Sequence, residues 1–488
     1  MLGAPGQGYG VWWRLPVVSR SGNMGSVMAR TFHIVNFGCQ MNAYEAELME
    51  GILRAKGWVR APCEAEADLV VFNTCVVREH AERRAKGRIG QLAGLKRRRP
   101  EMVIAVCGCM AQKEAERVLA VLPHVDLVLG PRALVRLGPL LDEVLATGQA
   151  RVCVDVFDPP YPRQARAVRR NRLRALVPIT YGCDNFCTYC IVPYTRGREV
   201  SRSPGEILEE IGRLVAEGCR EITLVGQNVN AWRAEGMRFA DLLRRVGAAA
   251  PEAWVRYITS HPRDCDEAHI AAVAETPNVV EHFHLPVQAG ADEVLRRMGR
   301  GYTRGHYLGL VERVRRAVPS ATVTTDLIVG FPGEGEAEYE QTLDLVGRVR
   351  FDAAFMYAYS PRSGTPAAER LNDHVAMEEK QRRLAGLIEL QEGISLEVNR
   401  GWIGAQAEVL IEGRAPRTRG DVLGRTRGDK MVVLPGGEEW IGRFRRVEIR
   451  EANAHTLFGC GVRGAVQRAE PIRSEGGSFT IAVDDGER

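Results

Sequence analysis

Between residues 31 and 150, short apolar runs alternate with segments of helical periodicity. The runs are TFHIVNFGC, DLVVFNTC, MVIAVCGC and VDLVLG, and a helical pattern follows each of them. This alternation predicts a parallel sheet that is covered by helices. Three of the four runs end in a cysteine, at Cys39, Cys75 and Cys109. Because ligands bind at the carboxyl ends of strands in open α/β sheets, these thiols are predicted to converge on one metal centre.

Most free cysteines are small buried side chains, and that is the alternative interpretation of each of the three. A single cysteine at a strand end would favour the interpretation as a buried side chain. Three such cysteines favour metal binding, as do the glycines Gly38 and Gly108, which precede two of them. Cys107 lies inside its apolar run, so we expect it in the core. The cysteines without any partner pattern are predicted to be structural: Cys63, Cys153, Cys219, Cys265 and Cys460.

The strand and helix rhythm restarts after an Arg-rich segment at 163–174. Six units follow, beginning with ALVPITYGC, REITLVGQNVN, AWVRYITSHP, VEHFHLPVQAG, TVTTDLIVGFPGE and DAAFMYAYSPR. Six units predict a partial (β/α) barrel, short of the eight in a closed one. Polar and glycine residues gather at the strand ends, where barrel enzymes keep their active sites. They are Gln227, Asn228, Ser260, His261, His284, Gln288, Gly330 and Glu334.

The C-terminal part has a different pattern. An amphipathic connecting helix is expected at 380–391, and from about 395 to 462 short alternating strands with Gly turns predict a small β-barrel. Such barrels often bind oligonucleotides. The segment GRTRGDK supplies positive charge on one of its loops, so RNA binding is predicted for Arg425, Arg427 and Lys430.

Composition narrows the class of protein. Apolar content of 45% and charged content of 26% are typical of a soluble globular protein, and no apolar run approaches the length of a membrane span. The first 30 residues lack the pattern of a signal peptide, so we expect a cytoplasmic protein. Twelve cysteines in a reducing compartment favour metal binding or catalysis over disulfides. The net charge is +5, and the positive charge is clustered in two runs, at 95–100 and 163–175. A solvated face and a nucleic-acid contact would each explain such a run.

The segment GCDNFCTYC carries three cysteines, Cys183, Cys187 and Cys190, at the spacing C-x3-C-x2-C with no fourth nearby. A four-iron cube needs four ligands, so three thiolates leave one iron open. An open iron can chelate S-adenosylmethionine (SAM) and feed an electron into its sulfonium, which is chemistry that the cofactor carries. A zinc site is the alternative.

The segment GCDNFCTYCIVPYTRGRE resembles the signature of the radical-SAM methylthiotransferases. FGCQMNAYEAE, NTCVVRE and CGCMAQ are similar to the second-cluster motifs of that family, and the C-terminal barrel resembles its TRAM domain, an RNA-binding module. The resemblance spans about residues 31 to 462. YTRGREVSR, VGQNVNAW, SHPRD and HLPVQAG most resemble the members that act on N6-dimethylallyladenosine in tRNA.

The resemblance implies an α/β protein with two 4Fe-4S clusters and two SAM molecules per turnover. One cluster, on Cys183, Cys187 and Cys190, would cleave SAM, and an auxiliary cluster, on Cys39, Cys75 and Cys109, would carry the sulfur. Gln227, Asn228 and Arg196 are expected to contact the cofactor. The reaction would place a methylthio group on C2 of N6-dimethylallyl(isopentenyl)adenosine next to the tRNA anticodon.

Two other functions stay open at this point: methylthiolation of threonylcarbamoyladenosine in tRNA, and tRNA binding without catalysis by a metal-containing protein. The expected partners are tRNA, an electron donor and a sulfur source, without a membrane, and we expect a monomer. The expected parts are a disordered extension at 1–30, the methylthiotransferase domain at 31–150, the Arg-rich linker at 151–174, the radical-SAM domain at 175–392, the TRAM domain at 393–462 and a disordered tail at 463–488.

Overall fold

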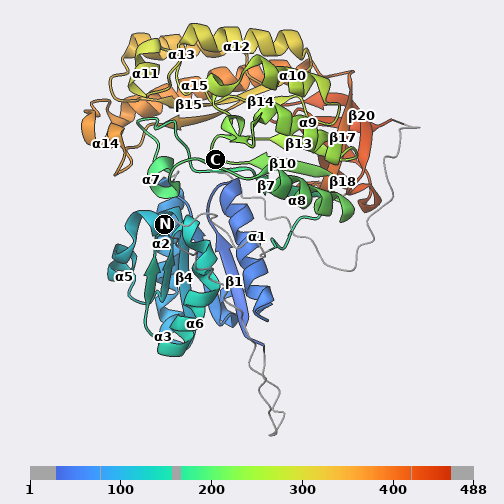
Figure 1. Cartoon of the computed structure of the whole chain (residues 1–488). Helices are drawn as coiled ribbons and strands as arrows, with labels where there is room; N and C mark the ends of the chain where they lie inside the picture. Colours follow the sequence, from blue (N-terminus) through green and yellow to red (C-terminus); the bar gives the residue numbers. More distant parts are fainter. Residues whose placement is uncertain (1–28, 77–78, 156–165, 419, 463–488) are drawn as a thin grey trace, which may run out of the picture.

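The computed structural model describes residues 29–76, 79–155, 166–418 and 420–462. Nearly all of the expected N-terminal extension, the whole expected tail and part of the Arg-rich linker therefore lie outside the described residues. Figure 1 shows a sheet domain at the bottom, a barrel above it and a smaller barrel at the right-hand side. No described helix is long and apolar enough to cross a membrane.

In the described part of the chain, the N-terminal domain is a six-stranded parallel sheet in the order β2-β1-β3-β4-β5-β6. Every residue of β3 and β4 is buried, because helices cover both faces of the sheet. The strands are β1 (Thr31–Asn36), β2 (Val59–Arg60), β3 (Leu69–Thr74), β4 (Val103–Gly108), β5 (Leu127–Leu129) and β6 (Arg151–Cys153).

Alternate residues of these strands feed two apolar cores. Leu69 and Val71 pack with helices α1 (Gln40–Ala55) and α6 (Leu137–Thr147), whereas Val70 and Phe72 pack on the opposite face. That face is covered by α2 (Glu79–Gln91), α4 (Cys109–Glu114) and α5 (Glu116–Val121), and α3 (Ala93–Arg98) follows α2. The predicted parallel sheet between helices is confirmed.

The central domain has six parallel strands among its described residues: β7 (Arg174–Pro178), β10 (Glu221–Val225), β13 (Trp254–Tyr257), β14 (His282–His284), β15 (Thr322–Val329) and β16 (Ala353–Ala358). They form two sheets, β13-β10-β7 and β14-β15-β16, which meet at a bridge between Val255 and Val279. Within the described chain β7 and β16 pair on one side only, so the barrel stays open between them. This confirms the predicted partial barrel.

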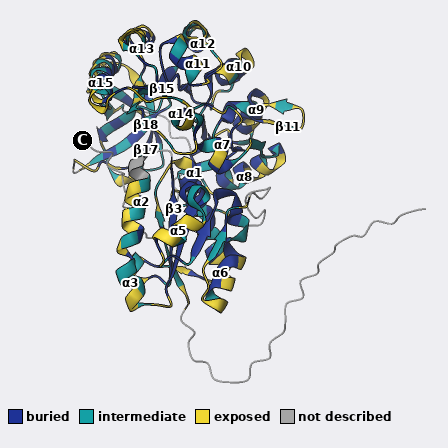
Figure 2. Cartoon of the chain, turned by 90° about the vertical axis from the view of Figure 1, so that its left-hand side faces the viewer, coloured by how far each residue is buried: buried dark blue, intermediate teal, exposed yellow. Residues whose placement is uncertain are grey.

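Helices pack around the outside of the barrel, and Figure 2 shows their exposed positions in yellow over buried, dark blue strands. These helices are α8 (Pro204–Ala216), α9 (Phe239–Ala249), α10 (Glu267–Glu275), α12 (Arg304–Ala317), α13 (Glu336–Val349) and α15 (Met377–Arg400). The shorter elements are β8 (Thr180–Tyr181), β9 (Val200–Ser201), α7 (Val192–Arg196), β11 (Arg233–Ala234), β12 (Met237–Arg238), α11 (Asp292–Arg297) and α14 (Pro366–Arg370).

The C-terminal domain is a closed barrel of five short strands among the described residues, in the order β17-β18-β19-β21-β20. Its core includes Val409, Val432 and Val447, each without exposed surface. The strands are β17 (Gln406–Arg414), β18 (Asp421–Thr426), β19 (Met431–Pro435), β20 (Phe444–Ala452) and β21 (Thr456–Gly461). The predicted small β-barrel is confirmed.

Candidate metal centres

The three strand-end cysteines lie at one edge of the N-terminal sheet. Cys39 precedes the first residue of α1, Cys75 follows β3, and Cys109 is the first residue of α4. Since β1, β3 and β4 are neighbours in the sheet, their carboxyl ends deliver the three thiols side by side. A hydrogen bond from the thiol of Cys75 lowers the pKa of Cys39 to about 5, with help from the charge of Arg196. Cys39 is thereby held ready to act as a thiolate ligand.

Two asparagines that the sequence analysis did not single out fix this edge. The amide of Asn42 donates to Asn73 Oδ1 and to the carbonyl oxygen of Thr74, both at 3.2 Å, and Asn73 Nδ2 donates to the Asn42 carbonyl at 2.7 Å. Both asparagines are buried, so the network joins the start of α1 to the end of β3. Gly38 allows the close approach, because a Cβ there would lie 2.8 Å from Cys75 Cβ. The signal for the asparagines was their place inside the motifs FGCQMN and FNTC.

Arg196 reaches this edge from the barrel domain. Its guanidinium donates to the carboxylate of Glu45 on α1 at 2.7 Å, and both side chains are buried. Burial raises the pKa of Cys109, and the charge of Arg196 opposes that rise. The structure therefore places Arg196 beside the N-terminal thiols, whereas the sequence analysis expected it to contact the cofactor of the other triad. Glu45 was not singled out from the sequence. Figure 1 shows α7, which ends at Arg196, between the two domains.

Cys183, Cys187 and Cys190 lie on the loop between β8 and α7. The amide of Cys190 donates to the carbonyl of Cys187 at 2.9 Å, which curls the loop. Burial raises the pKa of Cys183 to about 11 and that of Cys190 to about 12. Metal binding therefore has to displace protons from these thiols. The guanidinium of Arg300, another residue not singled out from the sequence, donates to Cys187 Sγ at 3.3 Å.

The donor chemistry fits iron–sulfur clusters, because each triad offers three thiols, the usual ligands of such clusters. Among the described residues no group of His, Cys, Asp or Glu is arranged to hold a single metal ion. A single ion needs ligands that converge on one point, whereas each thiolate of a cube binds a different iron.

Gln227 and Asn228, both predicted to lie near the cofactor, follow β10. Gln227 Oε1 accepts a hydrogen bond from the amide of Gly182 at 2.7 Å, directly before Cys183. Asn228 is buried, donates to Asp264 at 2.7 Å and accepts from the amide of His261 at 3.1 Å. Gln227 therefore positions the cysteine loop, and Asn228 ties the end of β10 to the segment after β13. Their contact with the cofactor stays a prediction.

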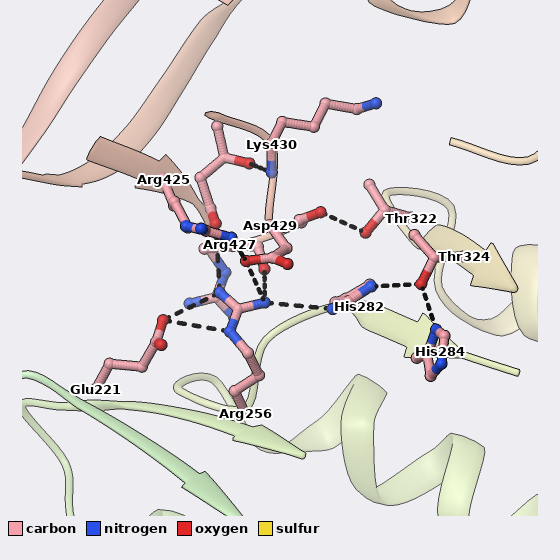
Figure 3. Close-up of polar contacts among 12 residues, drawn as sticks. Glu221, Arg256, His282, His284, Thr322, Thr324, Arg425, Arg427, Asp429 and Lys430 are labelled. Carbon is pink, nitrogen blue, oxygen red and sulfur yellow. Dashed lines mark hydrogen bonds and ion pairs between the residues drawn. The ribbon is translucent and has the colours of Figure 1, made fainter. Parts of the chain in front are cut away.

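The predicted RNA-binding cations lie on the hairpin between β18 and β19, which is docked on the barrel domain (Figure 3). Arg427 donates twice to the carboxylate of Glu281 at 2.7 Å. Lys430 Nζ lies 2.9 Å from Asp352, and its side chain is 8% exposed. Carboxylates of the barrel domain therefore balance these two charges, and the contact of the hairpin with RNA stays a prediction.

Arg425 has a partner within its own hairpin, since it donates to Asp429 at 3.0 Å. The hairpin meets the amino ends of the barrel strands, where Arg256 of β13 donates to the carbonyls of Arg427 at 3.2 Å and Thr426 at 3.4 Å. Thr322 of β15 donates to the carbonyl of Gly428 at 3.0 Å. The hairpin thus covers the amino ends of these barrel strands, and Figure 3 shows its contacts with Arg256 and Thr322.

The Arg-rich segment also has acidic partners. Arg169 pairs with Glu47 of α1 at 2.9 Å and with Glu210 of α8 at 2.6 Å, and Arg174 pairs with Glu221 at 2.8 Å. Arg169 therefore joins the sheet domain to the barrel, whereas Arg174 joins two neighbouring strands of the barrel, β7 and β10. Arg169 is thus neither on a solvated face nor free for nucleic-acid contact.

Three family models match the chain. They are the Uncharacterized protein family UPF0004 at residues 31–130, the Radical SAM superfamily at 177–346 and the TRAM domain at 403–460. Among solved structures, the radical SAM methyltransferase TsrM from Kitasatospora setae is similar, with a TM-score of 0.54 and 15% identity over 70% of this chain and 75% of that one. That likeness shows the fold alone.

Curated relatives match almost the whole described chain. The tRNA-2-methylthio-N(6)-dimethylallyladenosine synthase of Carboxydothermus hydrogenoformans is 46% identical over 435 residues, which cover 88% of this chain and 99% of the relative. The synthase of Moorella thermoacetica is 45% identical over 440 residues, 89% of this chain and 99% of the relative. With both thiol triads at strand ends and all three domains matched, the chain belongs to the tRNA-2-methylthio-N(6)-dimethylallyladenosine synthase family of radical-SAM enzymes.

Proposed function

We propose that the protein transfers a methylthio group to C2 of N6-dimethylallyladenosine next to the anticodon of tRNA. The observation that carries this proposal is the pair of thiol triads, one at the edge of the sheet and one on the loop between β8 and α7, in a chain whose relatives bear the name of that activity. Cys183, Cys187 and Cys190 would hold one 4Fe-4S cluster. Cys39, Cys75 and Cys109 would hold the second.

Bound at these triads, the clusters would supply one-electron reduction of SAM at the first and a sulfur atom at the second. The residues of this chain prepare both sites. Arg300 donates a hydrogen bond to Cys187 Sγ, and Gln227 orients the loop through Gly182. Arg196 and the Asn42–Asn73 network hold the other thiols in place. We propose two SAM molecules per turnover, one for the methyl group and one for hydrogen abstraction.

The substrate would be a base in the anticodon loop, which a protein can splay out of the stack at low cost. The TRAM domain would contribute to tRNA binding through surfaces other than the docked hairpin side chains. An external electron donor and a sulfur source are required. The cytoplasmic location and the monomeric state stay predictions.

Mass spectrometry of tRNA nucleosides tests the function. Cells that lack the protein should lose 2-methylthio-N6-dimethylallyladenosine and accumulate its precursor without the methylthio group. Loss of the methylthio group from threonylcarbamoyladenosine instead would establish the alternative enzyme. An unchanged nucleoside profile would favour a tRNA-binding protein without catalysis.

A further inference from the structure

The interior of the partial barrel is open to solvent along β15 and β16. On β15, Leu327 and Val329 are fully buried against the outer helices, whereas Asp326, directly before Leu327, keeps 30% of its side chain exposed. Because side chains alternate across a strand, Asp326 and Ile328 face the barrel interior. Phe355 of β16 lies opposite Asp326 in the register and is 53% exposed. Barrel interiors of this size are normally filled by side chains, so this exposure marks a hollow.

A chain of hydrogen bonds runs along the wall of the interior, from the docked hairpin toward this hollow (Figure 3). Arg256 Nη1 lies 3.4 Å from His282 Nδ1, His282 Nε2 lies 2.8 Å from Thr324 Oγ1, and that oxygen lies 3.0 Å from His284 Nδ1. Burial lowers the pKa of His282 to about 3, so its ring is neutral and carries one proton. These contacts set the direction of every hydrogen bond in the chain.

Arginine only donates, so His282 Nδ1 accepts and the proton of His282 is on Nε2. That proton goes to Thr324 Oγ1. The hydrogen of the Thr324 hydroxyl has no other acceptor among the described residues, so we assign it to the bond with His284 Nδ1. The other nitrogen of His284, Nε2, then carries the ring proton, and its N–H takes no part in this chain of hydrogen bonds. These tautomers are assigned from the hydrogen-bond partners.

The N–H of His284 and the carboxylate of Asp326 are both available to a ligand. His284 Nε2 lies 3.6 Å from Asp326 Oδ1, which is longer than a hydrogen bond. Among the described residues no hydrogen bond reaches that carboxylate. The ring of Phe355 lies 6.1 Å from the ring of His284, at 77° to it. The hollow thus presents one acceptor, one fixed donor and one exposed aromatic ring.

We propose that His284, Asp326 and Phe355 form a binding site for an adenine ring. Adenine offers the matching chemistry, because its N6–H donates, a neighbouring ring nitrogen accepts, and its face stacks on an aromatic side chain. An N6-alkylated adenine keeps one N6–H for Asp326, and Ile328 provides an apolar neighbour for the alkyl group. This inference rests on the proposed function and deepens it. Two sources supply such a ring, the target nucleotide of tRNA and SAM.

The test measures binding by reconstituted protein, with and without the substitutions Asp326→Ala and Phe355→Leu. The probes are SAM and two anticodon stem-loop RNAs, one with dimethylallyladenosine at the target position and one with uridine there. Removing one base–aromatic stack should weaken binding by about 5- to 100-fold. Met356→Leu is the matched control, because Met356 is the next residue on β16 and packs against the outer helices.

If the ring comes from tRNA, both substitutions erase the preference for the dimethylallyladenosine RNA and leave SAM affinity unchanged. If it comes from SAM, SAM affinity falls and the RNA preference persists. Unchanged affinities for every probe would overturn the proposed site, as would equal losses in Met356→Leu. If the wild-type protein forms the methylthiolated product and both variants bind every probe with wild-type affinity, the adenine site is refuted and the proposed function is not. Wild-type protein that forms no methylthiolated product refutes the proposed function instead.

Discussion

Replacing Arg256 with methionine perturbs the contact between the small barrel and the radical-SAM barrel at its most buried point. Arg256 is 2% exposed and donates to Glu221, whose side chain has no exposed surface, at 3.1 and 3.2 Å. It also lies 3.8 Å from Asp429 of the docked hairpin. Methionine replaces the aliphatic stem of arginine but not its guanidinium group, so the substitution removes the charge and the hydrogen bonds.

The expected loss follows from the buried carboxylates. Breaking a buried ion pair by removing one partner costs about 3–5 kcal/mol. Arg174 remains 2.8 Å from Glu221, so we expect the lower end, about 3 kcal/mol. For a domain of this size that loss lowers the melting temperature by about 6–12 °C. Differential scanning calorimetry of the reconstituted protein measures it, and Arg244→Met, at the exposed pair with Glu275, is the control, with an expected change below about 0.5 kcal/mol.

The effect should depend on pH in a defined direction. Burial acts to raise the pKa of Glu221 and of Asp429, but Arg256 and neighbouring arginines hold both below their usual values. In the wild type this stabilisation is present at neutral pH and is lost as the pH falls toward the lowered values. Without Arg256, burial raises the pKa values of Glu221 and Asp429. Protonation of these carboxyl groups at lower pH then removes the cost of burying their unpaired charges. The difference in melting temperature should shrink between pH 7 and pH 5. A difference below 2 °C at pH 7, or one that grows at pH 5, would refute this reasoning.

Two further predictions concern the cysteines and the hairpin. Cys107 is fully buried, and burial raises its pKa to about 12, so the Cys107→Ala protein should keep its full iron content. The Cys109→Ala protein should lose about half of the iron, because one of the two clusters is lost. Iron analysis of anaerobically purified protein measures this, and the reverse pattern would contradict the assignment of Cys109 as a cluster ligand. Because Lys430 is already paired with Asp352, Lys430→Ala should leave the slope of log affinity for tRNA against log salt unchanged. A slope that becomes shallower by about 0.7 to 0.9 in a binding titration, the change expected for the loss of one phosphate contact, would return this lysine to the RNA interface.

The sequence alone could group the cysteines into two triads because their positions follow from topology; that the triads bind clusters stays a prediction. Parallel strands end at one edge of a sheet, so the positions of Cys39, Cys75 and Cys109 after three apolar runs were enough to group them. The C-x3-C-x2-C loop is local, and its three thiols needed no knowledge of the fold. The six strand and helix units and the small barrel followed from periodicity in the same way.

The partners of the charged residues could not be predicted, because ion pairs join segments far apart in the chain. Arg196 and Glu45 are 151 residues apart, and Arg427 and Glu281 are 146 apart. A local run of positive charge gives no indication of whether the fold will supply carboxylates to it. The ion pairs of the predicted RNA-binding cations were missed for this reason. The direction of the Thr324 hydroxyl likewise depends on Arg256, which lies on another sheet.

The central claim is that the two triads perform different steps. The direct measurement incubates reconstituted enzyme with SAM, a reductant and tRNA carrying dimethylallyladenosine, and quantifies 5′-deoxyadenosine and the methylthiolated nucleoside by mass spectrometry. Cys183→Ala should form neither compound, whereas Cys75→Ala should still form 5′-deoxyadenosine without the methylthiolated nucleoside. Full methylthiolation by Cys75→Ala, or 5′-deoxyadenosine formation by Cys183→Ala, would contradict the account.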